Sequence, residues 1–255
     1  ARLVEYTPVA IKHVINEGTI IAHFDGRDKI NYRDLIEAQD VHEYGLRQLS
    51  ELTPIERRRL AYHEAGHTVA SYYLMDRYFP AFVTLHMHSD LEGAAAFAHQ
   101  RPKETIITKN QTDILAQIQI SLASRASEEL FLDVNLSGVS GDFMTATQLA
   151  TAYIGIYGMD GTLTSVLAFQ QLGGGGGMPI PKMPERIEAL LQAQMKEVKQ
   201  LFRDHSEAVI ALAEALIERE ELVADEIKEL IDEADSRKVM KSVLNDFEPL
   251  LSLPE

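Results

Sequence analysis

Hydrophobic and polar residues alternate with the period of an α-helix over most of the chain. Residues 7–24 begin with a threonine and a proline, which favour the N-cap and the first turn of a helix. A second helix is expected from Asn31 to Gly45. The two form a hairpin within residues 1–46 that is too small to fold alone, so it needs a partner.

The next predicted helix lies in LSELTPIERRRLAYHEAGHTVASYYL. Thr53, Pro54 and Glu56 form a capping-box start, and the apolar pattern continues toward Leu74. Gly66 lies in the middle of this helix, where glycine costs about 1 kcal/mol relative to alanine. Its presence indicates that another segment packs closely against that turn.

After Pro80 the period changes to two, which predicts a strand in AFVTLHMH, residues 81–88. One face would carry Val83, Leu85 and Met87, and the other Phe82, Thr84, His86 and His88. The turn-like SDLEG then precedes AAAFAHQ, so a short β-hairpin is expected.

The rest of the chain is predicted to be helical, which makes the fold class mainly α with a small hairpin or sheet beside the helix of residues 53–74. Helices are expected over residues 111–131 and 142–157, and others begin at Pro184, Ser206 and Ala224. The five glycines 173–177 predict a flexible loop, and residues 236–255 a weakly ordered tail.

Composition narrows the function classes. The chain of 255 residues has no cysteine, so any metal must be bound by His, Asp or Glu, and a reducing compartment is expected. A formal charge of −15 disfavours nucleic-acid binding. No apolar run is long enough to span a membrane. Because the chain begins at Ala1 within a helical pattern, we expect a fragment whose upstream part held any membrane anchor.

The strongest chemical signal is His-Glu-x-x-His at residues 63–67. Two histidines four residues apart on a helix project from one face and can converge on one ion. Glu64, one step around the helix, can reach a water on that ion and act as a general base. The motif predicts a zinc hydrolase, although the same five residues also occur by chance.

Several stretches together resemble the FtsH family, the membrane-bound AAA zinc proteases. They are RRRLAYHEAGHTVA, SRASEELF, SGVSGDFMTATQLATAYIGIYGMD and AEALIEREELVADEIKELI. The similarity extends over residues 7–233. This chain departs from the family pattern at Ala123 and Ser124, which replace paired glycines, and at Gly141, which replaces the usual Asn. The strand turn MHSDLEG also differs, which suggests a divergent branch.

The resemblance implies roles for particular residues. His63 and His67 would be zinc ligands, Glu64 the catalytic base and Asp142 the third ligand. An Asp near a helix start is favoured in its ionised form, although such a residue is more often only a helix cap. Glu128 is expected to hold the far nitrogen of a histidine ring, and it is the alternative third ligand.

The resemblance also implies an organisation. Residues 1–46 would be the end of an AAA lid subdomain, residues 47–235 the zinc peptidase domain, and residues 236–255 the tail. It implies a homo-hexamer, polypeptide substrates that pair with an edge strand near residues 94–99, and an AAA ATPase module upstream. The chain itself has no phosphate-binding loop.

The expected location is a reducing aqueous compartment, namely the cytoplasm, a mitochondrion or a plastid, beside a membrane that a missing segment would span.

Two alternative functions remain. One is a ring-forming scaffold without activity, against which intact His63, Glu64 and His67 argue. The other is a regulatory lid module of an ATPase. A second metal site at His86 and His88 is less favoured, because strand histidines are more often half-buried sheet residues.

Overall fold

The computed structural model divides the chain into two units by its contacts. One unit combines the N-terminal 51 residues with His86–Ala95, and the other contains Leu52–Leu85 and Ala96–Glu255. The sequence did not suggest that a later segment joins the first unit. The structure describes residues 6–45, 47–48, 52–88, 96–171 and 180–251. Position 46 lies outside them, and the boundary between residues 46 and 47 stays a prediction.

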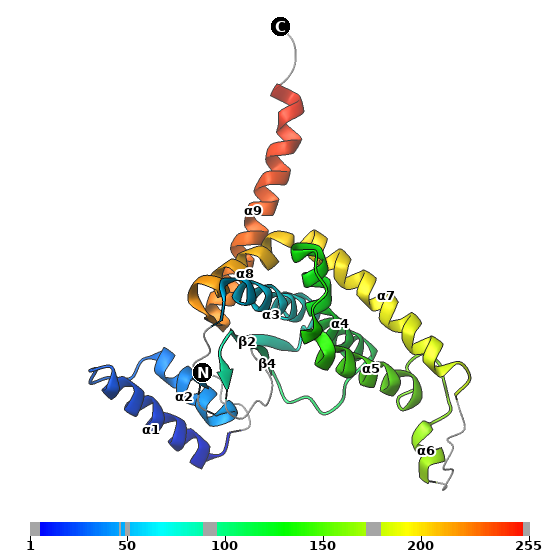
Figure 1. Ribbon diagram of the computed structural model, residues 1–255, viewed down its shortest axis with the longest axis horizontal. Helices are drawn as coiled ribbons and strands as arrows, with labels where there is room; N and C mark the ends of the chain where they lie inside the picture. The colour runs from blue at the N-terminus through cyan, green and yellow to red at the C-terminus, as the bar shows by residue number, and fades with distance from the viewer. Residues whose placement is uncertain (1–5, 46, 49–51, 89–95, 172–179, 252–255) are drawn as a thin grey trace. The chain divides into compact units, whose positions relative to one another are not determined.

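The smaller unit is built on the predicted helical hairpin, α1 (Pro8–Phe24) and α2 (Tyr32–Tyr44) (Figure 1). The Thr7 side chain accepts a hydrogen bond from the backbone N–H of Ala10, as expected for an N-cap. Two short strands, β1 (Arg47–Gln48) and β3 (Met87–His88), pair antiparallel in the same unit.

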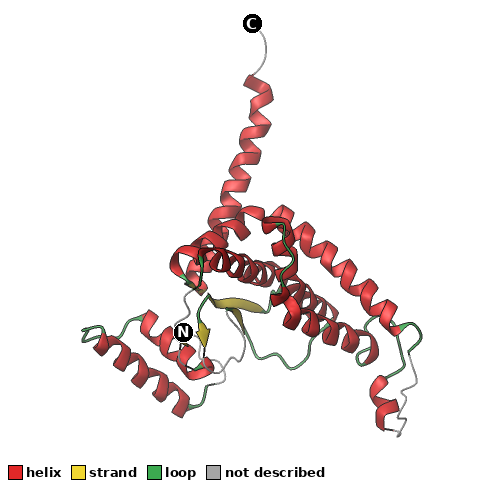
Figure 2. Ribbon diagram, in the orientation of Figure 1, coloured by secondary structure: helices red, strands yellow, loops and turns green. Residues whose placement is uncertain are grey.

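The larger unit is mostly helical, which confirms the predicted fold class (Figure 2). Its centre is α3 (Pro54–Leu74), which packs against α4 (Gln111–Ser127) and α8 (Ser206–Arg219). Helix α4 also packs against α5 (Ser140–Gly155) and α7 (Met183–Asp204). Shorter or peripheral elements are a π-helical turn at Glu128–Leu132, a 3-10 turn at Ser137–Val139, α6 (Val166–Gln171) and α9 (Ala224–Leu251).

A three-stranded antiparallel sheet lies against α3. Its central strand is β2 (Tyr78–Thr84), with β4 (Phe97–Pro102) on one side and β5 (Glu221–Val223) on the other. Thr84 lies opposite Phe97 in β4 and Glu221 in β5. The predicted hairpin is therefore present as the β2–β4 pair, while its turn at residues 89–95 lies outside the described residues.

The prediction of one strand over residues 81–88 is wrong. Strand β2 begins at Tyr78 and ends at Thr84, and Met87–His88 belongs to the smaller unit. Four consecutive residues, from Phe82 to Leu85, are buried. Because β2 lies between two strands and beneath helices, both of its faces are covered and the apparent alternation does not mark a solvent face. His86 and His88 consequently do not share a strand.

The C-terminal helix α9 continues to Leu251, so much of the segment predicted as a tail is helical. Residues 252–255 lie outside the described part, as do the glycines 173–177, and the predictions for both stay untested.

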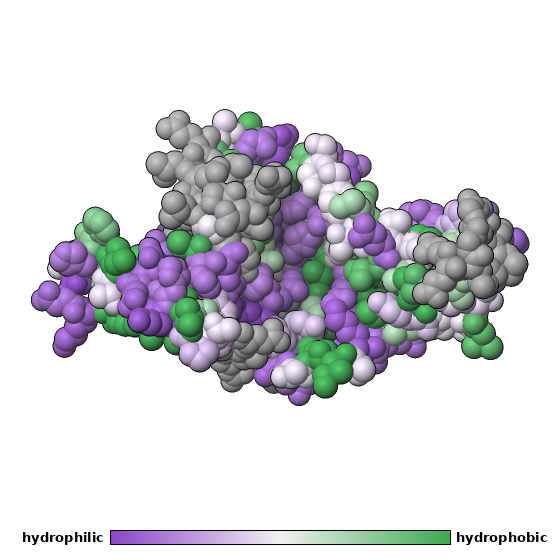
Figure 3. All heavy atoms as spheres, turned by 90° about the horizontal axis from the view of Figure 1, so that it is seen from below, coloured by the Kyte–Doolittle hydropathy of each residue, from purple (hydrophilic) through white to green (hydrophobic). Residues whose placement is uncertain are grey.

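Hydrophilic residues predominate on the face of the molecule drawn in Figure 3, and the hydrophobic ones form small separate groups. Among the described residues, no helix combines the length and the apolar character needed to cross a bilayer.

Helices α3 and α4 are in close contact at Gly66. A Cβ atom built there would lie 2.8 Å from the carbonyl oxygen of Ala123 and 2.9 Å from Cβ of Ser127. Both distances are shorter than real contacts allow, and one neighbour is backbone. The glycine predicted to mark close packing therefore sets the spacing of these two helices.

We predict that Gly66→Ala lowers the free energy of unfolding by about 1–2 kcal/mol. Overpacking costs about 1–3 kcal/mol, and about 2–3 kcal/mol is expected here because one neighbour is a backbone carbonyl. Alanine gains roughly 1 kcal/mol over glycine inside a helix, which reduces the net loss to the predicted value. Urea unfolding followed by circular dichroism measures the change.

Gly141→Ala is the matched control, because Gly141 is also helical but has nothing within 4 Å of a built Cβ. It should leave the stability unchanged or raise it by up to about 1 kcal/mol. Equal effects of the two substitutions would show that the α3–α4 contact is not tight.

Candidate metal centre

Helix α3 positions the two histidines of the motif. It starts at the Thr53 N-cap, whose hydroxyl oxygen accepts from the backbone N–H of Glu56 at 3.3 Å, with a proline in the first turn. One helical turn separates His63 from His67, and their ring centroids are 5.1 Å apart. Each side chain is 13% exposed, so both rings are mostly covered.

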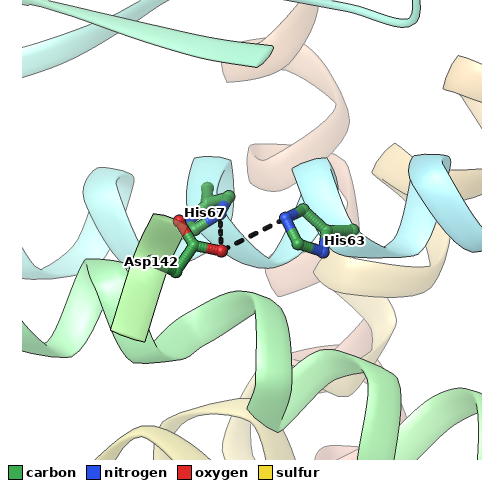
Figure 4. A group of neighbouring side chains, drawn as sticks. All are labelled: His63, His67 and Asp142. Atoms are coloured by element: carbon green, nitrogen blue, oxygen red, sulfur yellow. Dashed lines mark ion pairs between the residues drawn. The ribbon is translucent and has the colours of Figure 1, made fainter. Parts of the chain in front are cut away.

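Asp142 comes to the same point from α5, in the first turn of that helix. Its Oδ2 atom lies 3.3 Å from Nε2 of His63 and 3.4 Å from Nε2 of His67 (Figure 4). Among the described residues, these three form the one group of His, Asp or Glu side chains that could hold a metal ion. The structure thus brings together the three residues that the sequence predicted as ligands.

The Nδ1 nitrogen of each histidine ring also has a hydrogen-bond partner. Nδ1 of His67 lies 2.8 Å from the carbonyl oxygen of Ile120, and Nδ1 of His63 lies 3.0 Å from Oε1 of Glu128. A carbonyl or carboxylate oxygen only accepts, so both Nδ1 atoms carry the proton. With Nδ1 protonated, a ring that loses the proton on Nε2 presents that lone pair on the side of Asp142, as a metal-ligating histidine requires.

The distances from Oδ2 of Asp142 to the two Nε2 atoms suit a zinc ion. Zinc prefers tetrahedral coordination with bonds of about 2.0–2.1 Å to nitrogen and oxygen, which puts neighbouring ligand atoms roughly 3.3–3.4 Å apart. The two distances from Oδ2 to the Nε2 atoms have this length. Two imidazoles and one carboxylate also form a donor set that leaves a fourth position for water or substrate.

The electrostatics of the site favour a positive charge between these residues. Burial acts to lower the pKa of His63, but hydrogen bonds to Asp142 and Glu128 outweigh it and raise that pKa to about 10. Burial likewise acts to raise the pKa of Asp142, but His63 and His67 hold that pKa well below its usual range. Without a metal ion, protons on the two histidine rings supply this positive charge. A bound metal cation would take the place of those protons.

Glu64 is buried, with 4% of its surface exposed. Burial raises the pKa of its carboxyl group, and the nearby His67 and His63 only partly oppose this. A carboxyl group whose affinity for a proton is raised beside a candidate metal position is suited to accept and return a proton.

Glu128 is fully buried at the start of the π-helical turn. One carboxylate oxygen meets His63, and the other accepts from the backbone N–H of Leu136 at 3.0 Å and lies 3.6 Å from Nη1 of Arg125. It contacts the ring nitrogen that faces away from Asp142, as expected for an orienting group.

Two contacts at the site have no signal in the sequence motif. The Ile120 carbonyl is a backbone group, which any residue type would supply. The Ser124 hydroxyl donates to Oδ2 of Asp142 at 2.6 Å, although the sequence marked Ser124 only as a departure from a family pattern.

Comparisons with known proteins identify the family of the chain. The model of peptidase family M41 matches residues 50–230. The ATP-dependent zinc metalloprotease FtsH of Thermus thermophilus is 31% identical over 87% of this chain and 36% of its own length. The protein of the same name from Staphylococcus haemolyticus is 28% identical over 93% of this chain and 35% of its own length. The ATP-dependent zinc metalloprotease YME1L of Drosophila melanogaster is 29% identical over 91% and 32%.

The chain thus spans about a third of the length of these relatives. Within it, the family match covers most of the larger unit, including α3 and α5, whose side chains converge at the site. The chain belongs to peptidase family M41.

Proposed function

We propose that the chain is a zinc-dependent endopeptidase, the proteolytic part of an ATP-dependent AAA protease. The observation that carries this proposal is the convergence of Nε2 of both histidines on one carboxylate oxygen, each at the distance that tetrahedral zinc coordination gives. Membership of peptidase family M41 and similarity to ATP-dependent zinc metalloproteases support it.

His63, His67 and Asp142 would hold the zinc ion. When bound, zinc polarises the scissile carbonyl and acidifies a water molecule. Glu128 and the Ile120 carbonyl fix the two rings by their Nδ1 atoms, so neither ring has to reorient before it binds.

Glu64 performs the proton transfers. Its carboxylate takes a proton from the attacking water and gives it to the departing amine as the peptide bond breaks. The raised pKa serves both steps, because a group that binds a proton more readily also retains it until the amine leaves.

The substrate class is an extended polypeptide. Strand β4 lies at an edge of the described sheet, where a further strand can add through backbone hydrogen bonds. Residues 97–99 of the predicted edge belong to β4, and residues 94 and 95 lie outside the described part. Backbone pairing would give loose sequence specificity, since it reads the main chain.

The proposed partners are an AAA ATPase module upstream in the full-length protein, a membrane anchor in that upstream part, and five further copies of the chain. A folded substrate presents no free strand, so unfolding it requires work that nucleotide hydrolysis supplies. The peptidase part alone should therefore act only on chains that are already unfolded.

We predict that the zinc-loaded chain cleaves unfolded β-casein without ATP and that Glu64→Gln lowers the rate at least about 100-fold. The amide keeps the shape of the side chain but cannot accept the proton, and general-base catalysis contributes about 100-fold or more. Peptide release followed by chromatography, with zinc content measured by atomic absorption, checks this.

Glu56→Gln is the matched control, because Glu56 lies on the same helix but pairs with Arg59 at the surface. It should keep wild-type activity. Full activity of zinc-loaded Glu64→Gln would remove Glu64 from the mechanism. If the wild-type chain binds zinc but does not cleave casein, the alternative of a ring-forming scaffold without activity is favoured. If the chain alone cleaves a stably folded protein, the proposal that unfolding requires the upstream ATPase module is wrong.

A second prediction separates the ligand from the orienting group. Asp142→Asn should weaken zinc binding more than Glu128→Gln does. Glu128→Gln should lower the zinc affinity about 10–100-fold. One substitution removes charge at the ion, and the other removes a hydrogen bond to a ligand. A chelator competition titration measures both affinities, and the reverse order would make Glu128 the ligand.

The third prediction is a homo-hexamer. Apolar side chains remain exposed at Phe143, Met144 and Leu163 in the larger unit, as expected if copies of the chain cover them. Light scattering coupled to size exclusion should show a mass near six chains at micromolar concentration. A monomer over the whole micromolar range would refute the hexamer for this chain.

A further inference from the structure

Ser124 is a fully buried residue on α4 whose hydroxyl meets the proposed metal ligand on α5. Its Oγ donates to Oδ2 of Asp142 at 2.6 Å. This is the oxygen that faces Nε2 of both histidines, and the dashed lines in Figure 4 converge on it. The hydroxyl therefore acts on the atom that would bind the ion.

The contact is not the usual one for a serine inside a helix. Helical serine and threonine commonly donate to the carbonyl oxygen of their own preceding turn. Ser121 does this with Gln117 at 3.1 Å, and Thr68 with Glu64 at 2.8 Å. Ser124 instead bonds to a residue 18 positions later in the chain, on another helix.

Ser124 also has a regular place among the groups that orient the site. Ile120 and Ser124 are four residues apart on one face of α4, and Glu128, four residues further on, begins the π-helical turn that follows this helix. The Ile120 carbonyl meets His67, and the Glu128 carboxylate meets His63. The Ser124 hydroxyl contacts Asp142, so each of the three proposed ligands has one such partner.

Helix α4 is firmly placed at this point. The Ala123 carbonyl and the Ser127 side chain lie against Gly66, and Oγ of Ser127 donates to the Tyr62 carbonyl at 2.6 Å. Asp142, by contrast, sits in the first turn of α5 with 23% of its side chain exposed. A short hydrogen bond from α4 fixes this carboxylate relative to the histidines on α3.

We propose that Ser124 is a positioning residue that holds Oδ2 of Asp142 toward the two histidines and so raises the affinity for the metal ion. The inference rests on the proposed function, because it takes Asp142 as a zinc ligand.

The test is Ser124→Ala, with Ser121→Ala as the matched control one turn earlier on α4. Zinc affinity by chelator competition should fall about tenfold in Ser124→Ala and stay within about twofold in Ser121→Ala. With Co²⁺ in place of zinc, the visible absorption bands should shift in Ser124→Ala alone. The melting temperatures of the two metal-free variants should agree, which separates positioning from a general loss of stability.

A double-mutant cycle tests whether the hydroxyl acts through Asp142. In an Asp142→Ala background, Ser124→Ala should cause no further loss of zinc affinity. A loss that persists there, or wild-type zinc affinity and cobalt bands in Ser124→Ala, would overturn the proposal. If Asp142→Asn itself leaves zinc affinity unchanged, the proposed ligand set fails instead.

Discussion

The close contact between α3 and α4 at Gly66 is the constraint on which the candidate metal centre depends. Because no Cβ stands between the helices there, one face of α4 lies within hydrogen-bond reach of the site residues. Three groups from α4 and the π-helical turn that follows it, at residues 120, 124 and 128, each contact a different one of the three converging side chains. A shift of α4 by one residue would rotate all three away together, so the orienting contacts form or fail as a set.

The formal charges of the site explain why a cation fits there despite the acidic character of the chain. Glu64, Glu128 and Asp142 contribute three negative charges and Arg125 one positive charge, which leaves −3 + 1 = −2 with both histidines neutral. A divalent ion would balance this charge. Buried unbalanced charge is costly, which accounts for the high proton affinity of His63 and Glu64 in the protein alone.

Sequence reasoning was most successful where the information is local. Helical spacing placed His63 and His67 on one face, and capping residues marked the starts of α1 and α3. Contacts that depend on packing between distant segments were harder. The Ile120 carbonyl leaves no trace in side-chain identity, and the Ser124 hydroxyl gains meaning only once α5 is placed beside α4. The predicted strand at residues 81–88 continues past the end of β2 at Thr84. Because β2 is covered on both faces, the alternation of residue types does not indicate where it ends.

The sheet has a consequence for the order in which the chain can fold. Strand β5 pairs with β2 across a long stretch of chain, since Thr84 lies opposite Glu221, which is 221 − 84 = 137 positions later. Helices α3, α4 and α5 all lie before residue 156, so the segments that build the site are synthesised well before β5. During synthesis, one edge of β2 therefore has no partner strand until the C-terminal part that contains β5 has been made. Such late, non-local pairing slows folding and exposes a strand edge to aggregation, which favours chaperone protection of the nascent chain.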